Sequence, residues 1–117
     1  VDIYEYAVGD IEAGADPAAS GSFAQAAMFL DPLNKGGSSL VVQTARASSV
    51  TVNLTSLDRI LSATGARIFG MKLAVEGYEA QALRGARRLL AQRAPCVLAL
   101  ELNRRHLEKA NATMQEV

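Results

Sequence analysis

The chain has very few of the residues that build metal or disulfide frameworks. Its 117 residues include one cysteine, one histidine and no tryptophan. The single Cys96 excludes an internal disulfide framework and a zinc site made of cysteines, and the single His106 excludes a histidine-rich metal site. Cys96 lies among apolar residues at the start of a predicted strand, so we expect it to be buried and inert.

Long apolar runs and an excess of one charge are also missing. No apolar run approaches the roughly 18 residues of a membrane-spanning helix. Twelve lysines and arginines balance twelve aspartates and glutamates, so the chain lacks the basic excess of nucleic-acid-binding proteins. It has neither a GxGxxG nor a P-loop pattern for phosphate binding. We therefore expect no transmembrane segment and no nucleic-acid partner.

What the sequence does contain, in its second half, is the pattern of a strand, a helix and a second strand. Residues 68–74 form a short apolar run, which is typical of a strand buried on both faces. From Tyr78 the apolar residues recur with helical spacing, and Pro95, which has no N–H, ends the helix. A second apolar run covers residues 96–102. This pattern predicts a central βαβ unit with two parallel strands.

The polar residues of the predicted helix lie largely on one face, which we interpret as facing solvent. They are Glu79, Arg84, Arg87, Arg88 and Gln92. Arg93 joins the three arginines in a basic cluster, and a solvated helix face explains that cluster without any partner.

The carboxyl ends of the two predicted strands carry polar residues. Parallel strands end at the same edge of a sheet, where ligands bind in open α/β folds. The first strand brings Lys72, Glu76 and Gly77 to this edge, and the second brings Glu101 and Asn103. Glu101 ends an apolar strand, where an acid has no capping role, so a role in a site is favoured. Glu76 has two open interpretations: a site residue, or the N-terminal acid that the helix dipole favours.

The first half of the chain predicts shorter elements. Three segments favour extended structure because they are rich in apolar or β-favouring side chains: residues 2–8, 22–30 and 49–54. Residues 31–37 form a turn cluster, and strands on both sides of it would make an antiparallel excursion. Residues 11–21, rich in Ala, Gly, Asp and Ser, predict a loop.

Two further helices complete the prediction. Thr55 or Ser56 caps a helix over residues 57–63, and Gly65 ends it in the left-handed conformation. Residues 104–116 are polar and mostly compatible with a helix. Their apolar face is weak and consists of Leu107, Ala110 and Met114.

Three pieces of the sequence resemble the FkbM family of methyltransferases. KLAVEGYEAQALRGARRLL at 72–90, then a proline and VLALEL at 97–102, is similar to the family's C-terminal half. The family pattern there begins with a lysine, a hydrophobic residue and Asp-Val-Glu-Gly. An acid follows two residues later, then Leu-(Lys/Arg)-Gly-Ala, and then a strand that ends in glutamate. AVGD at 7–10 resembles the family's Ala-(Leu/Val)-Gly-Asp segment, and VNLTSLD at 52–58 resembles its strand and Thr-Leu-Asp helix start. The order and approximate spacing agree over nearly the whole chain.

The resemblance implies a fold, an activity and a set of site residues. The implied fold is a Rossmann-like class I methyltransferase sheet, present in part, in a single partial domain over residues 1–117. The implied activity is S-adenosylmethionine-dependent methyl transfer, typically to a hydroxyl of a sugar, a lipid or a small metabolite. The catalytic edge would consist of Lys72, Glu76 and Glu101. Asp10 and Gly77 would contact the cofactor, and for Asp10 a plain turn residue is the alternative.

Two departures from the family pattern qualify this expectation. The family's aspartate before Val-Glu-Gly is Ala74 here. The family's first strand and glycine-rich loop, and the second strand whose acid holds the ribose, have no counterpart. We therefore expect a fragment, a truncated product or a degenerate copy of such an enzyme. The alternative is a non-catalytic α/β scaffold or protein-interaction module that self-associates through an exposed sheet edge.

Overall fold

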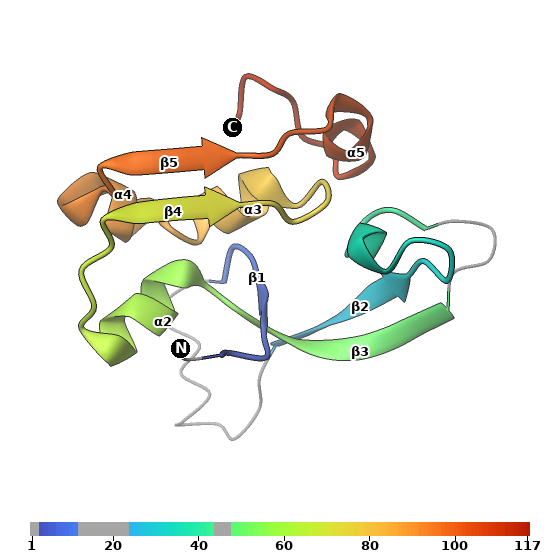
Figure 1. The fold of residues 1–117 in the computed structure, drawn as a ribbon, viewed down its shortest axis with the longest axis horizontal. Helices are drawn as coiled ribbons and strands as arrows, with labels where there is room; N and C mark the ends of the chain where they lie inside the picture. The colour runs from blue at the N-terminus through green and yellow to red at the C-terminus, as the bar shows by residue number, and fades with distance from the viewer. Residues whose placement is uncertain (1–2, 12–23, 44–47) are drawn as a thin grey trace.

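The computed structural model describes residues 3–11, 24–43 and 48–117, so the predicted loop at 11–21 lies almost entirely outside the described residues. Strands and helices are mixed, as expected for the α/β class (Figure 1). In chain order the elements are β1 (Ala7–Val8), β2 (Ala24–Leu30), the 3-10 helix η1 (Lys35–Gly37), β3 (Ser48–Thr55), α2 (Leu57–Thr64), β4 (Gly70–Leu73), α3 (Glu79–Arg84), α4 (Arg87–Arg93), β5 (Val97–Leu100) and α5 (Arg104–Lys109).

The described strands form two sheets. One has the order β1-β3-β2, with β1 parallel and β2 antiparallel to β3. The β2–β3 ladder confirms the predicted antiparallel excursion. The other sheet is the parallel pair β4–β5, in which Gly70 lies opposite Val97 and Leu73 opposite Leu100, as the βαβ pattern predicts. The described strands do not pair into one continuous sheet. The Rossmann-like arrangement is therefore not confirmed and stays a prediction.

The helix predicted after Tyr78 is interrupted at Gly85, between α3 and α4. In an unbroken helix the Leu89 N–H would donate to the Gly85 carbonyl. Here the Gly85 carbonyl accepts from the backbone N–H of Asp58 at 2.9 Å. The Leu89 N–H donates to Asp58 Oδ1 at 2.8 Å. Asp58, through its backbone and its side chain, therefore satisfies both groups of the missing helical bond.

Gly85 is also the point where three distant segments meet. A Cβ atom at residue 85 would lie 2.1 Å from the carbonyl oxygen of Gly9 and 3.2 Å from the Cβ of Ser56. These residues belong to the AVGD, TSLD and LRGA segments that carry the family resemblance. Those segments therefore form a structural joint that sets α2 against α4.

The predicted caps of α2 are confirmed, whereas the predicted C-terminal helix is shorter than expected. Ser56 is the N-cap of α2 and accepts from the Arg59 N–H, and Gly65 ends the helix at φ 64°. The helix expected over residues 104–116 stops at Lys109, and Asn111 follows with φ 53°.

Two small apolar clusters join the elements of the second half. The first joins β4 to α3 and consists of the buried residues Leu73, Ala82 and Leu83. The second joins α3 to α5 and consists of Ala80, Leu107 and Ala112. Of the weak apolar face predicted at the C-terminus, Leu107 is fully buried, whereas Met114 is 50% exposed.

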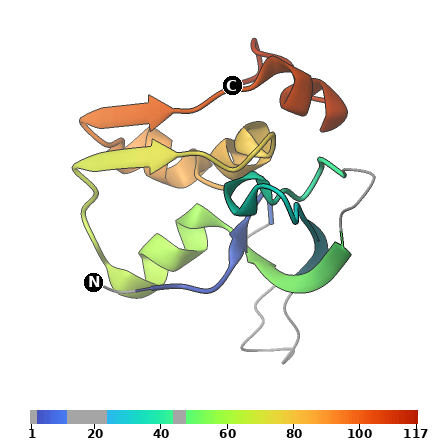
Figure 2. The same ribbon diagram turned by 45° about the vertical axis from the view of Figure 1, so that its right-hand side comes forward.

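α3 and α4 cover one face of the β4–β5 sheet, and no described helix covers the other (Figure 1, Figure 2). The sequence predicts that the first of these strands is buried on both faces, but in β4 only Leu73 is buried. In β5, Val97 is 56% exposed. Cys96 is exposed rather than buried. It precedes β5 at the uncovered amino-terminal end of the sheet, where it lines a surface hollow.

The polar face predicted for the α3–α4 segment is only partly in solvent. Three arginines remain half exposed but pair with acids from other segments: Arg84 with Glu116, Arg87 with Asp10 and Arg88 with Asp58. Glu79, assigned to the same face, is buried with 1% exposure. The prediction for Glu79 is wrong because this side chain turns back onto the loop before its own helix.

Candidate functional site at the carboxyl ends of β4 and β5

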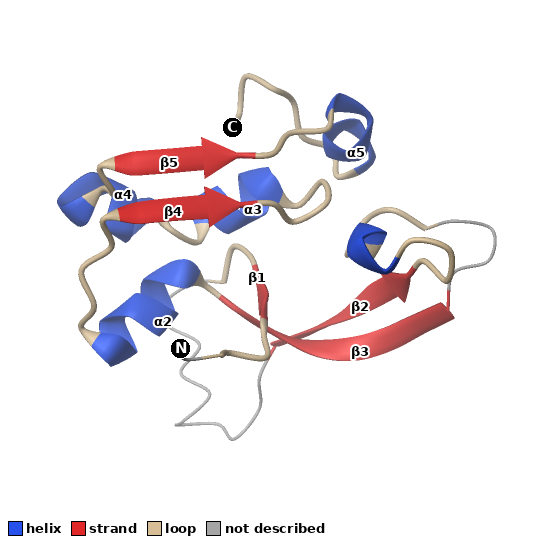
Figure 3. Ribbon diagram, viewed as in Figure 1, coloured by secondary structure: helices blue, strands red, loops and turns tan. Residues whose placement is uncertain are grey.

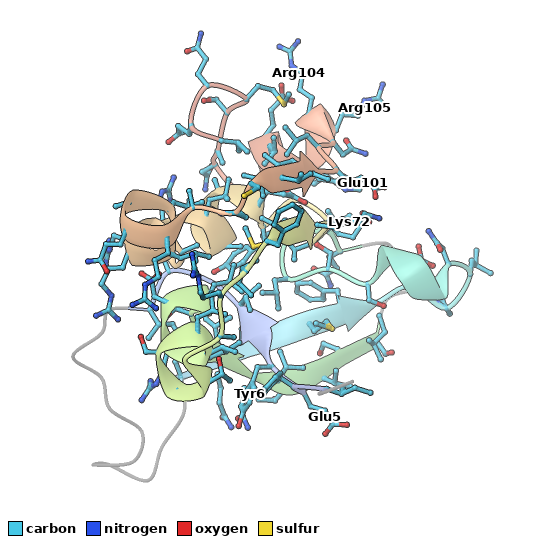
Figure 4. All side chains as sticks on the ribbon, turned by 60° about the vertical axis from the view of Figure 1, so that its left-hand side comes forward. Glu5, Tyr6, Lys72, Glu101, Arg104 and Arg105 are labelled. Atoms are coloured by element: carbon cyan, nitrogen blue, oxygen red, sulfur yellow. The ribbon has the colours of Figure 1, made fainter. Side chains whose placement is uncertain are left out.

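The loops that leave β4 and β5 lie at the same end of the sheet (Figure 3). The ladder continues one residue beyond β5, since the Glu101 N–H donates to the Leu73 carbonyl at 3.0 Å. Lys72 and Glu101 lie side by side (Figure 4), with Lys72 Nζ 3.5 Å from Glu101 Oε2. Their side chains are 71% and 66% exposed, so water and salt screen this ion pair strongly.

The turn between β4 and α3 is built around a buried carboxylate. Glu76 and Gly77 both have positive φ, 50° and 99°. Glu79 Oε1 accepts from the N–H groups of Val75 at 3.1 Å and Gly77 at 3.2 Å. Glu79 therefore stabilises the conformation of the turn. Glu76 is the other acid of the turn, and its side chain is not used in these hydrogen bonds.

A second anchor reaches this turn from the antiparallel excursion. Ser39 is 2% exposed and exchanges two backbone hydrogen bonds with Phe29 of β2. Its hydroxyl donates to the Glu76 carbonyl at 2.7 Å and accepts from the N–H groups of Val41 and Val42. The first half of the chain therefore contributes directly to the position of Glu76.

α5 packs on the other side of the same turn through His106. A Cβ atom at residue 77 would lie 2.7 Å from the Cβ of His106, so only glycine fits there. His106 Nδ1 lies 3.3 Å from Glu76 Oε2, and the two side chains are 25% and 29% exposed. The sequence interpretation considered His106 only as a metal ligand and missed this pair. The strand-end argument would have found it, had it been extended to the first turn of the helix that follows the second strand.

A cavity of about 220 Å³ opens beside Glu76. It lies between β1, the segment after η1 and the β4–α3 turn. Its walls include Tyr6, Ser39, Ala74, Glu76 and Tyr78. Ala74, which replaces the family's aspartate, thus lies in the wall of this cavity. A larger hollow of about 610 Å³ lies at the amino-terminal ends of β4 and β5, opposite the edge where open α/β sheets bind ligands.

The two residues assigned to the cofactor lie in different places: Asp10 pairs with α4, and Gly77 lies in the β4–α3 turn. Asp10 Oδ1 lies 3.8 Å from Arg87 Nη1 at the start of α4. Gly77 is buried against His106, which leaves no room for a side chain at residue 77. Contact of either residue with S-adenosylmethionine therefore stays a prediction.

The residues that the structure describes form neither a metal site nor a membrane-spanning helix. No group of three or more His, Cys, Asp or Glu side chains among them is placed to hold a metal ion. No helix among them has the length and apolarity to cross a membrane.

Comparison with known proteins gives one match. The sequence profile of the family described as "Methyltransferase FkbM domain" matches residues 3–117. No curated protein and no solved structure matches the chain.

Proposed function

Because the chain belongs to the FkbM methyltransferase family, whose members transfer methyl groups and generally use S-adenosylmethionine, we propose that it acts in methyl transfer to a hydroxyl oxygen. The acceptor would be a sugar, a lipid or a small metabolite, bound in the cavity beside Glu76. The observation that carries this proposal is the lining of that cavity. Ala74, Val75, Glu76 and Tyr78, which come from the most specific part of the family resemblance, all line it.

The size and polarity of the cavity support a small hydroxylated group as its occupant. Its volume of about 220 Å³ is below the roughly 300–1,000 Å³ typical of drug-sized ligands. The wall combines apolar side chains with a few polar groups from Tyr6, Ser39, Glu76 and Tyr78. Such a site can hold one ring or the end of a chain and orient its hydroxyl by hydrogen bonds.

The cofactor side of the reaction has less support. Asp10 is paired with Arg87, and Gly77 is covered by His106. We therefore assign to the described residues the acceptor side of methyl transfer and expect S-adenosylmethionine to bind this chain more weakly than about 1 mM.

The test is a titration of the ¹⁵N-labelled chain, followed by backbone amide signals. Methyl glucoside, glycerol and octanol serve as hydroxyl probes of the sugar, small-metabolite and lipid kinds, and S-adenosylmethionine is titrated separately. At least one hydroxyl probe should shift the amide signals of Glu76 and Tyr78. The amides of Arg67 and Phe69, in the larger hollow, serve as the control. Shifts confined to that hollow, or no shift with any probe, would contradict the assignment of the cavity.

A substitution at residue 74 sharpens this test. Ala74→Asp returns the family's carboxylate to the cavity wall, where it can accept a hydrogen bond from a bound hydroxyl. A hydrogen bond to a charged group contributes about 1.5–3 kcal/mol, so the responding probe should bind about 10- to 150-fold more tightly. Ala91→Asp is the matched control, since Ala91 is exposed on α4. Equal affinities in the two variants would remove residue 74 from the site.

A further inference from the structure

Two walls of the acceptor cavity come from parts of the chain that are far apart in sequence. One belongs to the antiparallel excursion and includes Met28, Gly36 and residues 38–40. The other belongs to the β4–α3 turn, residues 74–76. The segment that contains η1 lies beside this turn in both ribbon views (Figure 1, Figure 2). The shape of the cavity therefore depends on what holds the excursion against the turn.

The hydroxyl of Ser39 joins these two walls. It donates to the carbonyl oxygen of Glu76, 37 residues away in sequence, at 2.7 Å. It also accepts from the N–H groups of Val41 at 3.1 Å and Val42 at 3.0 Å. A hydroxyl has one proton to donate and two lone pairs. Because both lone pairs are engaged within the excursion, the proton is directed across the gap to the turn.

The groups at both ends of this bond are held in place. Ser39 is 2% exposed, and its backbone exchanges hydrogen bonds of 2.8 and 3.0 Å with Phe29 of β2. Glu76 has φ 50°, a left-handed conformation that costs free energy in any residue but glycine. Residues in such conformations concentrate at functional sites and persist only where the surrounding structure holds them. The bond from Ser39 is one of the contacts that hold Glu76 in this conformation.

A serine bond of this kind can also serve stability alone, and α2 contains an example. The hydroxyl of Ser62 donates to the carbonyl of Asp58, likewise at 2.7 Å, but both residues belong to one helix. Neither of them lines the acceptor cavity. Ser39 and Glu76 both line it, and they belong to different walls. The two bonds are therefore alike in chemistry and differ in what they join.

We propose that Ser39 is a positioning residue of the acceptor site, whose hydroxyl holds the excursion against the β4–α3 turn and so fixes the width of the cavity. Its proton and lone pairs are all engaged, so it acts through the walls and not by bonding to the acceptor. A cavity whose walls are already fixed binds more tightly, because less ordering is needed on binding. The excursion, which adds the side chain of Met28 to the wall, then helps to select the acceptor.

The first test compares two serine variants that lose bonds of equal length. Ser39→Ala removes the bond between the walls, and Ser62→Ala removes the bond within α2. Of methyl glucoside, glycerol and octanol, the probe that shifts the cavity amides should bind Ser39→Ala about fivefold more weakly than the wild type, the equivalent of one hydrogen bond. Ser62→Ala should bind it as the wild type does. The ¹³C signal of the Glu76 carbonyl, which should move only in Ser39→Ala, reads the broken bond directly.

A second measurement uses the wild-type chain, so it holds even if circular dichroism shows that Ser39→Ala does not fold. Hydrogen exchange of the Val41 and Val42 amides reports on the Ser39 hydroxyl, to which both donate. A ligand that binds the cavity with its walls in place stabilises the bonds that hold them. Saturation with the same probe should therefore slow both amides. The Arg59 amide, which donates to the Ser56 hydroxyl of α2, is the control and should not change.

This inference rests on the proposed function, but the two fail in different ways. If a probe binds Ser39→Ala as tightly as the wild type, the acceptor site stands and the role of Ser39 is overturned. An equal loss of affinity in Ser62→Ala, or unchanged exchange of the Val41 and Val42 amides, also overturns it. If no probe shifts the cavity amides, the proposed function itself is contradicted, and the Ser39 bond is then a structural bond only.

Discussion

A position in this chain can require glycine for two reasons: a backbone conformation that other residues avoid, or too little space for a side chain. Two glycines illustrate one reason each. Gly85 has an ordinary helical conformation at φ −71°, but a Cβ there would lie 2.1 Å from a backbone oxygen. Gly65 has φ 64° and no atom within 4 Å of a Cβ position. The first position restricts volume and the second restricts conformation.

The two alanine variants should therefore differ in stability. Gly85→Ala forces Gly9 or α3 to move and should lower the free energy of unfolding by at least about 3 kcal/mol. Gly65→Ala places a Cβ in the left-handed region and should cost about 1 kcal/mol. Urea unfolding of both variants measures the difference. Equal losses would mean that the joint around Gly85 accommodates a Cβ at no greater cost than the left-handed conformation of residue 65.

Glu79 is a second residue whose role is structural. Glu79→Ala would leave the part-buried N–H of Val75 and the buried N–H of Gly77 without an acceptor. At about 1–3 kcal/mol for each of the two unsatisfied groups, the expected loss of stability is about 2–6 kcal/mol. Glu79→Gln keeps an accepting oxygen and should stay within about 1 kcal/mol of the wild type. The same urea unfolding measures both, and a stable Glu79→Ala would show that water replaces the carboxylate in the turn.

Among the elements, α4 has an unusual start. Its own N-cap residue, Ala86, provides no side-chain hydrogen bond. The cap comes instead from Asp58 of α2, whose two carboxylate oxygens accept from the N–H groups of Arg88 and Leu89 at 2.9 and 2.8 Å. An interhelical cap of this kind ties the start of α4 to the position of α2.

Removal of the interhelical cap should loosen the start of α4. Asp58→Ala should cost about 2 kcal/mol, the upper end for loss of an N-cap, and should speed hydrogen exchange of the Arg88 and Leu89 amides. Ser56→Ala is the control, because it removes the cap of α2 itself and leaves those two amides bonded. Unchanged exchange in Asp58→Ala would mean that α4 begins without help from α2.

The origin of each cap explains how much of the fold the sequence predicts. Ser56 and Gly65 act on their own helix, so local spacing is sufficient to place both ends of α2. Asp58 acts on a helix 30 residues later, and no local pattern reveals such a partner. For this reason the sequence predicts one long helix where the chain forms α3 and α4.

The candidate site divides in the same way. Apolar runs and strand ends suffice to bring Lys72 and Glu101 to one edge, because parallel strands end at the same edge of a sheet. The pairing of Glu76 with His106 depends on how α5 folds back against the β4–α3 turn. The role of Asp10 depends on Arg87, which comes from another element. Sequence patterns therefore find the strand-borne residues of the site and miss those that tertiary packing adds.

At the scale of the whole molecule, the described strands leave sheet edges open. β4 and β5 form a sheet of two strands, and β5 pairs with no other described strand. In a parallel ladder, alternate N–H groups of a strand face away from its partner. Val97 and Glu101 donate toward β4, so the N–H groups of Leu98 and Leu100 point to the outer edge. Such an edge pairs readily with a second chain.

We therefore predict self-association through the β4–β5 sheet, which is also what the interaction-module alternative requires. The average mass from sedimentation should rise with protein concentration. Val97→Lys places a charge on a residue that is 56% exposed beside this edge and should suppress the rise, since edge lysines oppose pairing. Ile3→Lys, at a residue 83% exposed and outside the strands, should not. A mass that stays at 12.4 kDa at every concentration would exclude edge pairing. The non-catalytic scaffold would then lose its main support, and the acceptor site would be the favoured function.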